Sequence, residues 1–505
     1  MKNDRPNILL LFTDQQRFDS IAALGNPIIK TPALDRLVRG GVTFTRACTP
    51  SPVCVSARCA LVTGLPPHRT KCVDNMPMPM ETTSVMQRLA AVGYQGHGVG
   101  KMHFTPKARD LWGFESRDFS EEGGGEDEFK TALVNAGYGH VHDPHGVRSE
   151  MYYIPQPSQL PARLHHSAWV VDRSIAFLER RDRSRPFFLW TSFIKPHPPF
   201  ESPTPWNKLY RCPEMPLPKR PQDWRNLLTY WNLVQNRYKY RDQGVDDNLI
   251  RTMIAAYYAC ISFIDYNVGR LLDYLAAKGE MENTLILFST DHGELLGDYH
   301  SFGKRCMLDS AARIPLLAHW PKRFAAGQRC DAPTSLLDIA PTCLAAAGVA
   351  DPFNGACGGD LAAIAAGQAK REMVFSQFQQ GRTGQYMAVS REWKYVYSAA
   401  DDREWLLDLT ADPAETRNRA ENPMYRGQTA AMRKALIEYF QREGYTDPLD
   451  GSDWKRFPKM QMPADPDAGL LFQDPPGSTA VPAPGYERKT NVVPKDSYRL
   501  LQPSK

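Results

Sequence analysis

Apolar residues in this chain gather in short runs, separated by stretches in which apolar positions recur every three or four residues. Four segments predict strands in the interior of a sheet, at residues 8–12, 97–99, 187–193 and 284–288. Helical spacing predicts helices from residue 32 onward and at 85–92, 168–180 and 247–275. Strands that alternate with helices indicate an α/β fold, with a large, mostly parallel sheet flanked by helices.

Each of the four predicted strands ends in a cluster of polar residues. The clusters contain Asp14 and Gln15, then Lys101 and His103, then His197, and finally Asp291 and His292. Because parallel sheets bind their ligands at the carboxyl edge of the strands, we expect one site that gathers these side chains.

The pattern changes after about residue 370. Short strands are expected at 373–376, 386–390, 393–397 and 405–408, followed by a helix at 428–440. From about residue 447 the chain is rich in Pro, Asp and Gly and loses its periodicity, which is typical of a wrapping arm or a disordered tail. We therefore predict a catalytic domain at 1–370, a smaller α+β subdomain at 371–446 and a Pro-rich tail at 447–505.

Composition excludes several classes of function. The formal charge is only +5 over 505 residues, and no basic block interleaved with aromatic residues indicates a nucleic-acid partner. No stretch approaches the length of a membrane span, and the start of the chain lacks the pattern of a secretory leader, so we expect a cytoplasmic protein. The ten cysteines include no Cys-x-x-Cys pair and are expected as buried, reduced thiols, apart from Cys54.

The segment from Cys54 to Gly64 carries the most specific motif. It reads Cys-Val-Ser-Ala-Arg and ends in Leu-Val-Thr-Gly. This resembles the signature of the sulfatase family, in which Cys is followed at the second position by Pro or Ala and at the fourth by Arg. Other segments resemble the family in the same order: 31–37, 41–44, 100–103, 290–293, 303–304, 313–316, 393–395 and 406–413. The motif choices are closest to choline-sulfatase-like members and phosphonate monoester hydrolases, which implies an alkaline-phosphatase-like fold.

The resemblance also implies a mechanism. Cys54 is oxidised to formylglycine by a formylglycine-generating enzyme, and one hydroxyl of the aldehyde hydrate attacks the sulfur of a small sulfate ester. The family's pattern makes Arg58 a partner of the hydrate, one helical turn along. The remaining assignments are Lys101 and Lys304 as sulfate clamps, His103 as the base and His197 as the acid that protonates the leaving alcohol.

Asp14, Gln15, Asp291 and His292 resemble the family's metal ligands, with position 54 as a further ligand. Their oxygen donors suit a single divalent cation, with Ca²⁺ favoured and Mg²⁺ or Mn²⁺ as alternatives. The imidazole of His292 moves the preference slightly towards a transition metal such as Mn²⁺.

Several of these residues have an ordinary structural explanation when they are considered alone. Lys101 would be a solvated surface lysine in most proteins, and Lys304 beside Arg305 would be an exposed basic pair. His197 lies in a Pro-rich stretch that is typical of a rigid loop. For these three residues the functional interpretation depends on the family resemblance.

Three functions remain open on the sequence. The first is hydrolysis of an alkyl, aryl or sugar sulfate, and the second is hydrolysis of a phosphonate monoester or phosphodiester at the same site. The third is a non-catalytic anion-binding member, which only Ser56 favours, because it stands where the family has Pro or Ala. The leaving group depends on the irregular stretch at 110–164 and on the tail, and a homo-oligomer is expected only if that tail wraps a neighbour.

Overall fold

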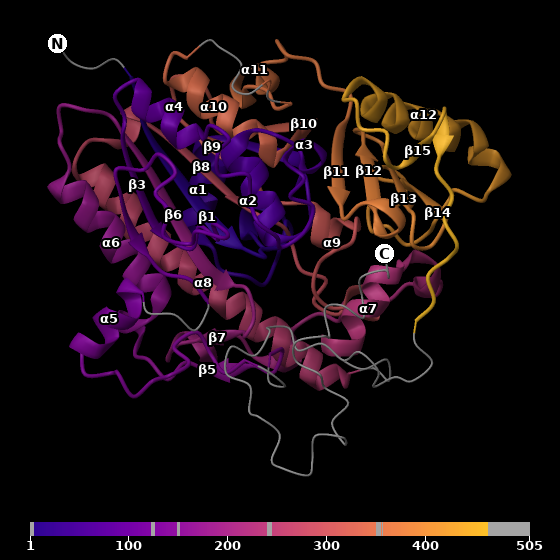
Figure 1. The fold of residues 1–505 in the computed structure, drawn as a ribbon. Helices are drawn as coiled ribbons and strands as arrows, with labels where there is room; N and C mark the ends of the chain where they lie inside the picture. The colour runs from indigo at the N-terminus through magenta and orange to yellow at the C-terminus, as the bar shows by residue number, and fades with distance from the viewer. Residues whose placement is uncertain are drawn as a thin grey trace.

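The computed structural model describes residues 5–122, 127–148, 152–239, 245–349, 355 and 357–462. Their arrangement is dominated by a large sheet on one side and a smaller sheet on the other (Figure 1). The large sheet contains β1 (Asn7–Asp14), β2 (Val42–Cys48), β3 (Gln95–Gly100), β4 (Ser116–Phe119), β6 (Phe187–Pro196), β8 (Thr284–Thr290), β9 (Leu317–His319) and β10 (Gln328–Ser335). Its strand order is β10-β2-β9-β8-β1-β6-β3-β4.

The large sheet is parallel apart from β9, which runs antiparallel to β2 and β8. The four strands expected from the sequence become β1, β3, β6 and β8, and they are neighbours in this sheet. Thr13 pairs with Thr290, Asp14 with Pro196, and Gly100 of β3 lies beside β6. The polar clusters at the ends of these strands therefore meet at one edge, which confirms the predicted fold class.

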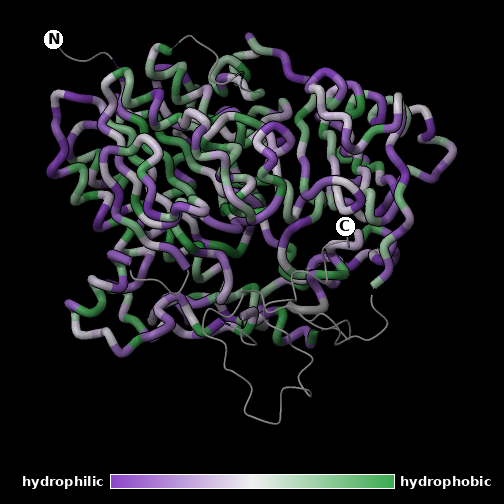
Figure 2. The backbone as a smooth tube through the Cα atoms, in the orientation of Figure 1, coloured by the Kyte–Doolittle hydropathy of each residue, from purple (hydrophilic) through white to green (hydrophobic). Residues whose placement is uncertain are grey.

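Helices cover both faces of the large sheet. One face is covered by α1 (Pro32–Gly40), α6 (His166–Arg180) and α8 (Asp247–Ala277), and the other by α2 (Cys54–Thr63), α4 (Val85–Ala91), α10 (Ile339–Ala346) and α11 (Leu361–Ala365). Side chains alternate along β1, so Leu9 and Leu11 pack on the first face while Leu10 and Phe12 pack on the second. The strands are accordingly the most hydrophobic part of the molecule (Figure 2).

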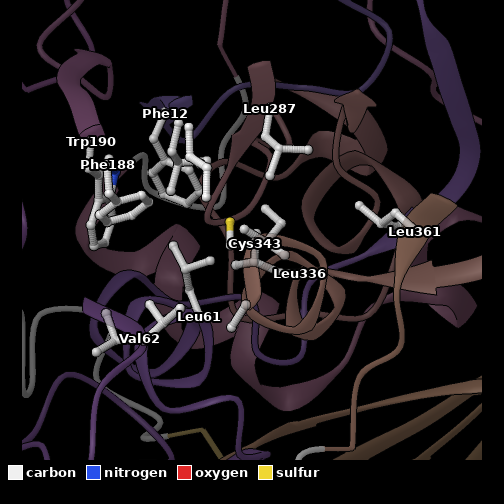
Figure 3. Close-up of a cluster of buried hydrophobic side chains, with 14 of the residues drawn as sticks. Phe12, Leu61, Val62, Phe188, Trp190, Leu287, Leu336, Cys343 and Leu361 are labelled. Carbon is white, nitrogen blue, oxygen red and sulfur yellow. The ribbon is translucent and has the colours of Figure 1, made fainter. Parts of the chain in front are cut away.

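The hydrophobic cluster on the second face holds α2 against the sheet. Figure 3 shows Leu61 and Val62 of this helix near Phe12, Trp190 and Leu287, with Cys343 of α10 beside them. Phe12 and Trp190 meet edge to face with ring centroids 5.7 Å apart. Each fully buried side chain of this size stabilises the fold by about 1.5–3 kcal/mol, so this packing fixes the helix that begins at Cys54.

The start of α1 departs from the sequence prediction in one respect. Thr31 is the N-cap residue, as expected, but its side chain does not bond the helix backbone. The first amides of the helix, Ala33 N and Leu34 N, instead donate to the carboxylate of Asp265 at 3.0 and 2.7 Å. Asp265 belongs to α8, so a distant helix supplies the cap.

The smaller sheet is antiparallel, as its short polar-apolar strands predict. It contains β11 (Val374–Phe378), β12 (Gln385–Val389), β13 (Trp393–Ser398) and β14 (Arg403–Asp408), and α12 (Arg426–Arg442) packs on it. A hairpin of β15 (Leu449–Asp450) and β16 (Asp453–Trp454) follows, and the Trp454 ring stacks on Tyr397 at 4.5 Å. The predicted arm is thus packed as far as this hairpin, and residues 463–505 lie outside the described residues.

The remaining elements are short. They are α3 (Pro67–Thr70), α5 (Glu128–Asn135), α7 (Tyr230–Lys239), α9 (Asp309–Ala312), β5 (Gln156–Pro157) and β7 (Glu201–Ser202). All ten cysteines are free, and eight of them are buried. Among the described residues, no helix has both the length and the apolar character needed to span a bilayer.

Candidate active site

Cys54 is the first residue of α2 and is 2% exposed. Val53 before it is extended and makes no side-chain capping bond. Asn75 supplies part of the missing cap, because its Oδ1 accepts from Val55 N at 3.2 Å. A helix N-terminus favours negative charge, which suits a nucleophile or an anionic substrate at position 54.

The ligand atoms of Asp14, Cys54, Asp291 and His292 all lie within 4.8 Å of one another. Cys54 Sγ is 3.2 Å from His292 Nε2 and 3.8 Å from Asp14 Oδ1. His292 Nδ1 lies 3.0 Å from the Gly293 carbonyl oxygen, which can only accept, so Nδ1 carries a proton there. In the neutral ring Nε2 then carries the lone pair and faces Cys54, the arrangement that metal-bound histidines have.

Gln15 joins this cluster through an amide whose orientation is set by Glu294. The carboxylate of Glu294 accepts from Gln15 Nε2, so the amide oxygen of Gln15 points the other way. That oxygen accepts from Lys304 Nζ at 2.6 Å, beside Cys54. The Gln15 backbone has φ 65° and its N–H donates to Asp291 Oδ1 at 3.0 Å, which ties the end of β1 to the end of β8.

The guanidinium of Arg58 is fully buried between the two aspartates. Its Nε donates to Asp291 Oδ2 at 2.9 Å and one Nη donates to Asp14 Oδ2 at 3.1 Å. The other Nη donates to the Lys101 carbonyl at 2.7 Å. Arg58 lies one turn along α2 from Cys54, as the sequence predicts, but its observed partners are the carboxylates rather than the Cys54 side chain.

Two lysines bring further positive charge to Cys54. Lys304 Nζ is 3.0 Å from Cys54 Sγ, and Lys101 Nζ is 2.7 Å from Asp14 Oδ2. Both are at most 2% exposed, so neither is the surface lysine that its local sequence would suggest. Burial alone would raise the pKa of the Cys54 thiol, but the charges of Lys304 and Lys101 hold that pKa well below its ordinary value.

The two aspartates respond to this environment in opposite directions. Burial works to raise the pKa of Asp14, yet the charges of Lys101 and Arg58 bring it down to about 2. Burial and the proximity of Asp14 raise the pKa of Asp291 above its ordinary value. Two carboxylates this close repel each other unless cations lie between or beside them.

His197 and His103 complete the predicted set. His197 is buried, and its Nδ1 lies 2.8 Å from Glu122 Oε1. Burial works to lower the pKa of His197, but the Glu122 carboxylate outweighs it and raises the pKa above its ordinary value. His103 is half-buried with φ 58°, and its backbone N–H donates to Glu121 Oε1 at 2.7 Å.

The cluster fits a divalent cation. Two carboxylates and one imidazole nitrogen converge beside the Cys54 sulfur, and the amide oxygen of Gln15 shares Lys304 Nζ with that sulfur. Oxygen-rich sets of this kind suit Ca²⁺, Mg²⁺ or Mn²⁺. A cation there would relieve the repulsion between Asp14 and Asp291, which supports the assignment of these residues as its holders.

Two acidic residues at the site escaped the sequence analysis. Glu294 directly follows the Asp291-His292-Gly293 motif, so its position alone was a signal that it lies near the strand end. Glu122 belongs to the run Glu121-Glu122-Gly123 in the irregular stretch, where no pattern distinguishes it from a solvated loop residue.

The fold and the site together define a class of protein: an α/β protein with a large, mostly parallel sheet, whose carboxyl edge holds Cys54 at a helix N-terminus beside a cluster of potential metal ligands. The phosphonate monoester hydrolase of Agrobacterium radiobacter has the same fold, with a TM-score of 0.76, 24% identity, and coverage of 90% of this chain and 100% of that chain. The phosphonate monoester hydrolase from Silicibacter pomeroyi gives a TM-score of 0.75 and 23% identity, and the match covers 88% of this chain and 97% of that chain.

Sequence comparison identifies the family. The sulfatase profile matches residues 6–349, and the C-terminal profile of N-sulphoglucosamine sulphohydrolase matches residues 297–442. An arylsulfatase of Clostridium perfringens is 29% identical, covering 88% of this chain and 96% of the relative. A choline-sulfatase of Rhizobium meliloti is 30% identical, covering 84% of each. The chain therefore belongs to the sulfatase family of enzymes, in the alkaline phosphatase superfamily.

Proposed function

We propose that this protein hydrolyses a sulfate monoester through a formylglycine formed at position 54. One observation carries the proposal. The side chain of Cys54 lies at the N-terminus of α2, within 4.8 Å of Asp14, Asp291 and His292 and 3.0 Å from Lys304 Nζ. This arrangement neutralises the charge of a bound sulfate monoester, which is a monoanion, and holds a nucleophile in one place.

The chemistry follows from the residues around position 54. When Cys54 is converted to formylglycine, one hydroxyl of the aldehyde hydrate attacks sulfur and the ester oxygen departs as an alcohol. The second hydroxyl then loses its proton, the carbon–oxygen bond to sulfate breaks, and the aldehyde is restored. A divalent cation, when bound, would lower the pKa of the attacking hydroxyl and hold a sulfate oxygen.

The side chains divide the remaining work. Lys101 and Lys304 neutralise sulfate oxygens, and Arg58 keeps Asp14 and Asp291 in place as ligands. His197 donates the proton to the leaving oxygen, since its protonated form is favoured by Glu122. His103, which lies close enough to position 54 to lower the pKa of the Cys54 thiol, takes the proton from the second hydroxyl.

The first test is the mass of the tryptic peptide 47–58, from protein produced together with a formylglycine-generating enzyme. Conversion of Cys54 lowers that mass by about 18 Da, a covalent change of the kind that sequence does not reveal. Cys59 in the same helix is the internal control, because its peptide keeps the mass of a thiol. A thiol at both positions would contradict the formylglycine mechanism and support the non-catalytic alternative.

The second test is turnover of matched sulfate and phosphate esters. The expected result is hydrolysis of sulfate monoesters that Cys54→Ala abolishes and Cys59→Ala leaves intact. Preference for phosphonate monoesters or phosphodiesters would replace this proposal with the second candidate. Both ester classes belong in the test because one relative, PehA of Trinickia caryophylli, is named as a multifunctional alkaline phosphatase superfamily protein; it is 30% identical and covers 83% of this chain.

A further inference from the structure

Glu122 lies between two of the cationic side chains at the site. Its Oε1 is 2.8 Å from His197 Nδ1, and its Oε2 is 3.0 Å from Lys101 Nζ. Arg148 lies further away, with Nη1 3.8 Å from Oε2. The Glu122 side chain is only 12% exposed, so these interactions are formed largely out of water.

Two acceptors lie at the same nitrogen of His197. The Pro198 carbonyl oxygen and Glu122 Oε1 are both 2.8 Å from Nδ1. The carbonyl can only accept, so it keeps a proton on Nδ1, and the Glu122 carboxylate attracts the protonated ring and restrains its position. Nε2 of the protonated ring is then the nitrogen left to give a proton to the reacting group, and Cys54 lies close enough to His197 to raise its pKa.

The second oxygen of Glu122 acts on Lys101. Lys101 Nζ is 2.7 Å from Asp14 Oδ2 and 3.0 Å from Glu122 Oε2, so two carboxylates restrain the ammonium group. A lysine has four rotatable bonds and would otherwise sample several positions. Glu122 therefore restrains the sulfate clamp and the proton donor with one side chain.

We propose that Glu122 is a positioning residue, which holds His197 and Lys101 in the geometry that catalysis requires. The inference rests on the proposed function, because it assigns the proton donor and the sulfate clamp their roles. Burial would raise the pKa of Glu122, but the charges of His197 and Lys101 hold it well below its ordinary value. The carboxylate consequently stays ionised and forms an ion pair with both partners.

The kinetic test compares Glu122→Gln with the natural protein on sulfate esters whose leaving alcohols differ in acidity. For alkyl sulfates, which need a proton on the leaving oxygen, we expect kcat to fall about 10–100-fold because His197 is misoriented. For 4-nitrophenyl sulfate, which leaves readily without a proton, kcat should fall far less. An equal loss across the series, or no loss, would overturn the role assigned to His197 orientation.

A binding test needs no turnover and separates this inference from the proposed function. Removing a negative charge from the site should tighten the binding of inorganic sulfate if charge alone matters. Loss of the restraint on Lys101 should instead raise the Kd by at least about threefold, measured by titration calorimetry. Unchanged or tighter binding would refute the positioning role even in a protein that hydrolyses no sulfate ester.

Two further variants serve as controls. Glu115→Gln removes a glutamate from an exposed pair with Arg185 and should change neither kcat nor sulfate affinity. Glu122→Asp keeps the charge on a shorter side chain and should restore part of the alkyl sulfate activity. Thermal unfolding of each variant shows whether a loss comes from unfolding. Failure of Glu122→Asp to restore any activity in a folded protein would count against the assignment.

Discussion

The buried carboxylate of Glu294 determines which atom of the Gln15 amide faces the metal-ligand cluster. It accepts from Gln15 Nε2, from Tyr153 Oη at 2.8 Å and from Leu296 N at 2.9 Å. These donors leave the Gln15 amide in a single orientation, with its oxygen towards Lys304 and the metal-ligand cluster. An amide is otherwise able to present either end, so Gln15 depends on this partner in a way that an aspartate would not.

The first prediction concerns Glu294→Gln. The variant places an NH₂ group where Glu294 now only accepts, so the Gln15 amide loses its restraint and presents its oxygen less often. Outer-shell changes of this kind lower metal affinity about 10–100-fold. The measurement is titration calorimetry with Ca²⁺ and, separately, Mn²⁺, which also distinguishes the two candidate ions.

Glu415→Gln is the matched control for this prediction. Glu415 is equally buried, but its partners are Lys394 and Asp309 N, away from the cluster. The metal affinity of the Glu415→Gln variant should equal that of the natural protein. If Glu294→Gln binds both ions as tightly as this control does, Gln15 does not need Glu294 to act as a ligand.

At the scale of elements, α8 does more than cover the sheet. It supplies Asp265 to the first turn of α1, where Ala33 N and Leu34 N donate to the carboxylate. Burial raises the pKa of Asp265 to about 7, despite these two hydrogen bonds that lower it. The packing of two helices is therefore linked to one titrating group that no part of the proposed mechanism uses.

The second prediction is that Asp265→Ala lowers the free energy of unfolding by about 1–3 kcal/mol, because two buried amides lose their acceptor. The loss should depend on pH. Since the folded pKa lies above the unfolded value, the folded protein keeps a proton between about pH 4 and pH 7 that the unfolded chain releases. The contribution of Asp265 to the free energy of unfolding is therefore greatest near pH 4 and decreases as the pH rises through 7.

Urea unfolding of the natural protein and Asp265→Ala at several pH values measures this difference. The difference in the free energy of unfolding between the two proteins should decrease as the pH increases, by at most about 1.4 kcal/mol per pH unit. Asp273→Ala, on an exposed part of the same helix, should show no such trend. If that difference in the free energy of unfolding increases with pH, the backbone amides affect the pKa of Asp265 more strongly than burial does.

At the scale of the whole molecule, a buried ionic cluster joins the smaller sheet to α9. Lys394 of β13 in the smaller sheet contacts Asp309 at the start of α9 and lies 2.5 Å from Glu415 Oε1. Its Nζ also donates to the Met307 carbonyl at 3.0 Å, only three residues beyond Lys304. The position of the loop that carries Lys304 is thus coupled to the smaller sheet.

The third prediction concerns Lys394→Met. Removing the Lys394 ammonium takes the cation partner away from the buried Glu415 carboxylate and leaves Asp309 with Arg313 at 3.3 Å, so we expect the free energy of unfolding to fall by about 3–5 kcal/mol. The exposed pair of Lys434 and Glu438 provides the comparison, because Lys434→Met should change stability by less than about 1 kcal/mol. Chemical denaturation measures both, and similar small losses would show that Lys394 does not hold α9 against the smaller sheet.

Much of the fold was predictable from local sequence. The run from Ile8 to Phe12, the helical spacing of α8 and the short strands of the smaller sheet all form where the pattern indicates, within a few residues. These features depend on the period of apolar positions, which any segment displays by itself. The strand endings at Asp14 and Asp291 also predict one shared site, because parallel neighbours bring their carboxyl ends together.

Tertiary structure alone decided the partners of those residues. Arg58 bonds two aspartates from different strands, Asp265 rather than Thr31 caps α1, and Glu122 reaches His197 across 75 residues of chain. Side chains so far apart in sequence leave no periodic signal that links them, and burial converts an ordinary Lys or Glu into an element of a charged network. The sequence by itself determined which side chains stand at the sheet edge, and packing determined which of them touch.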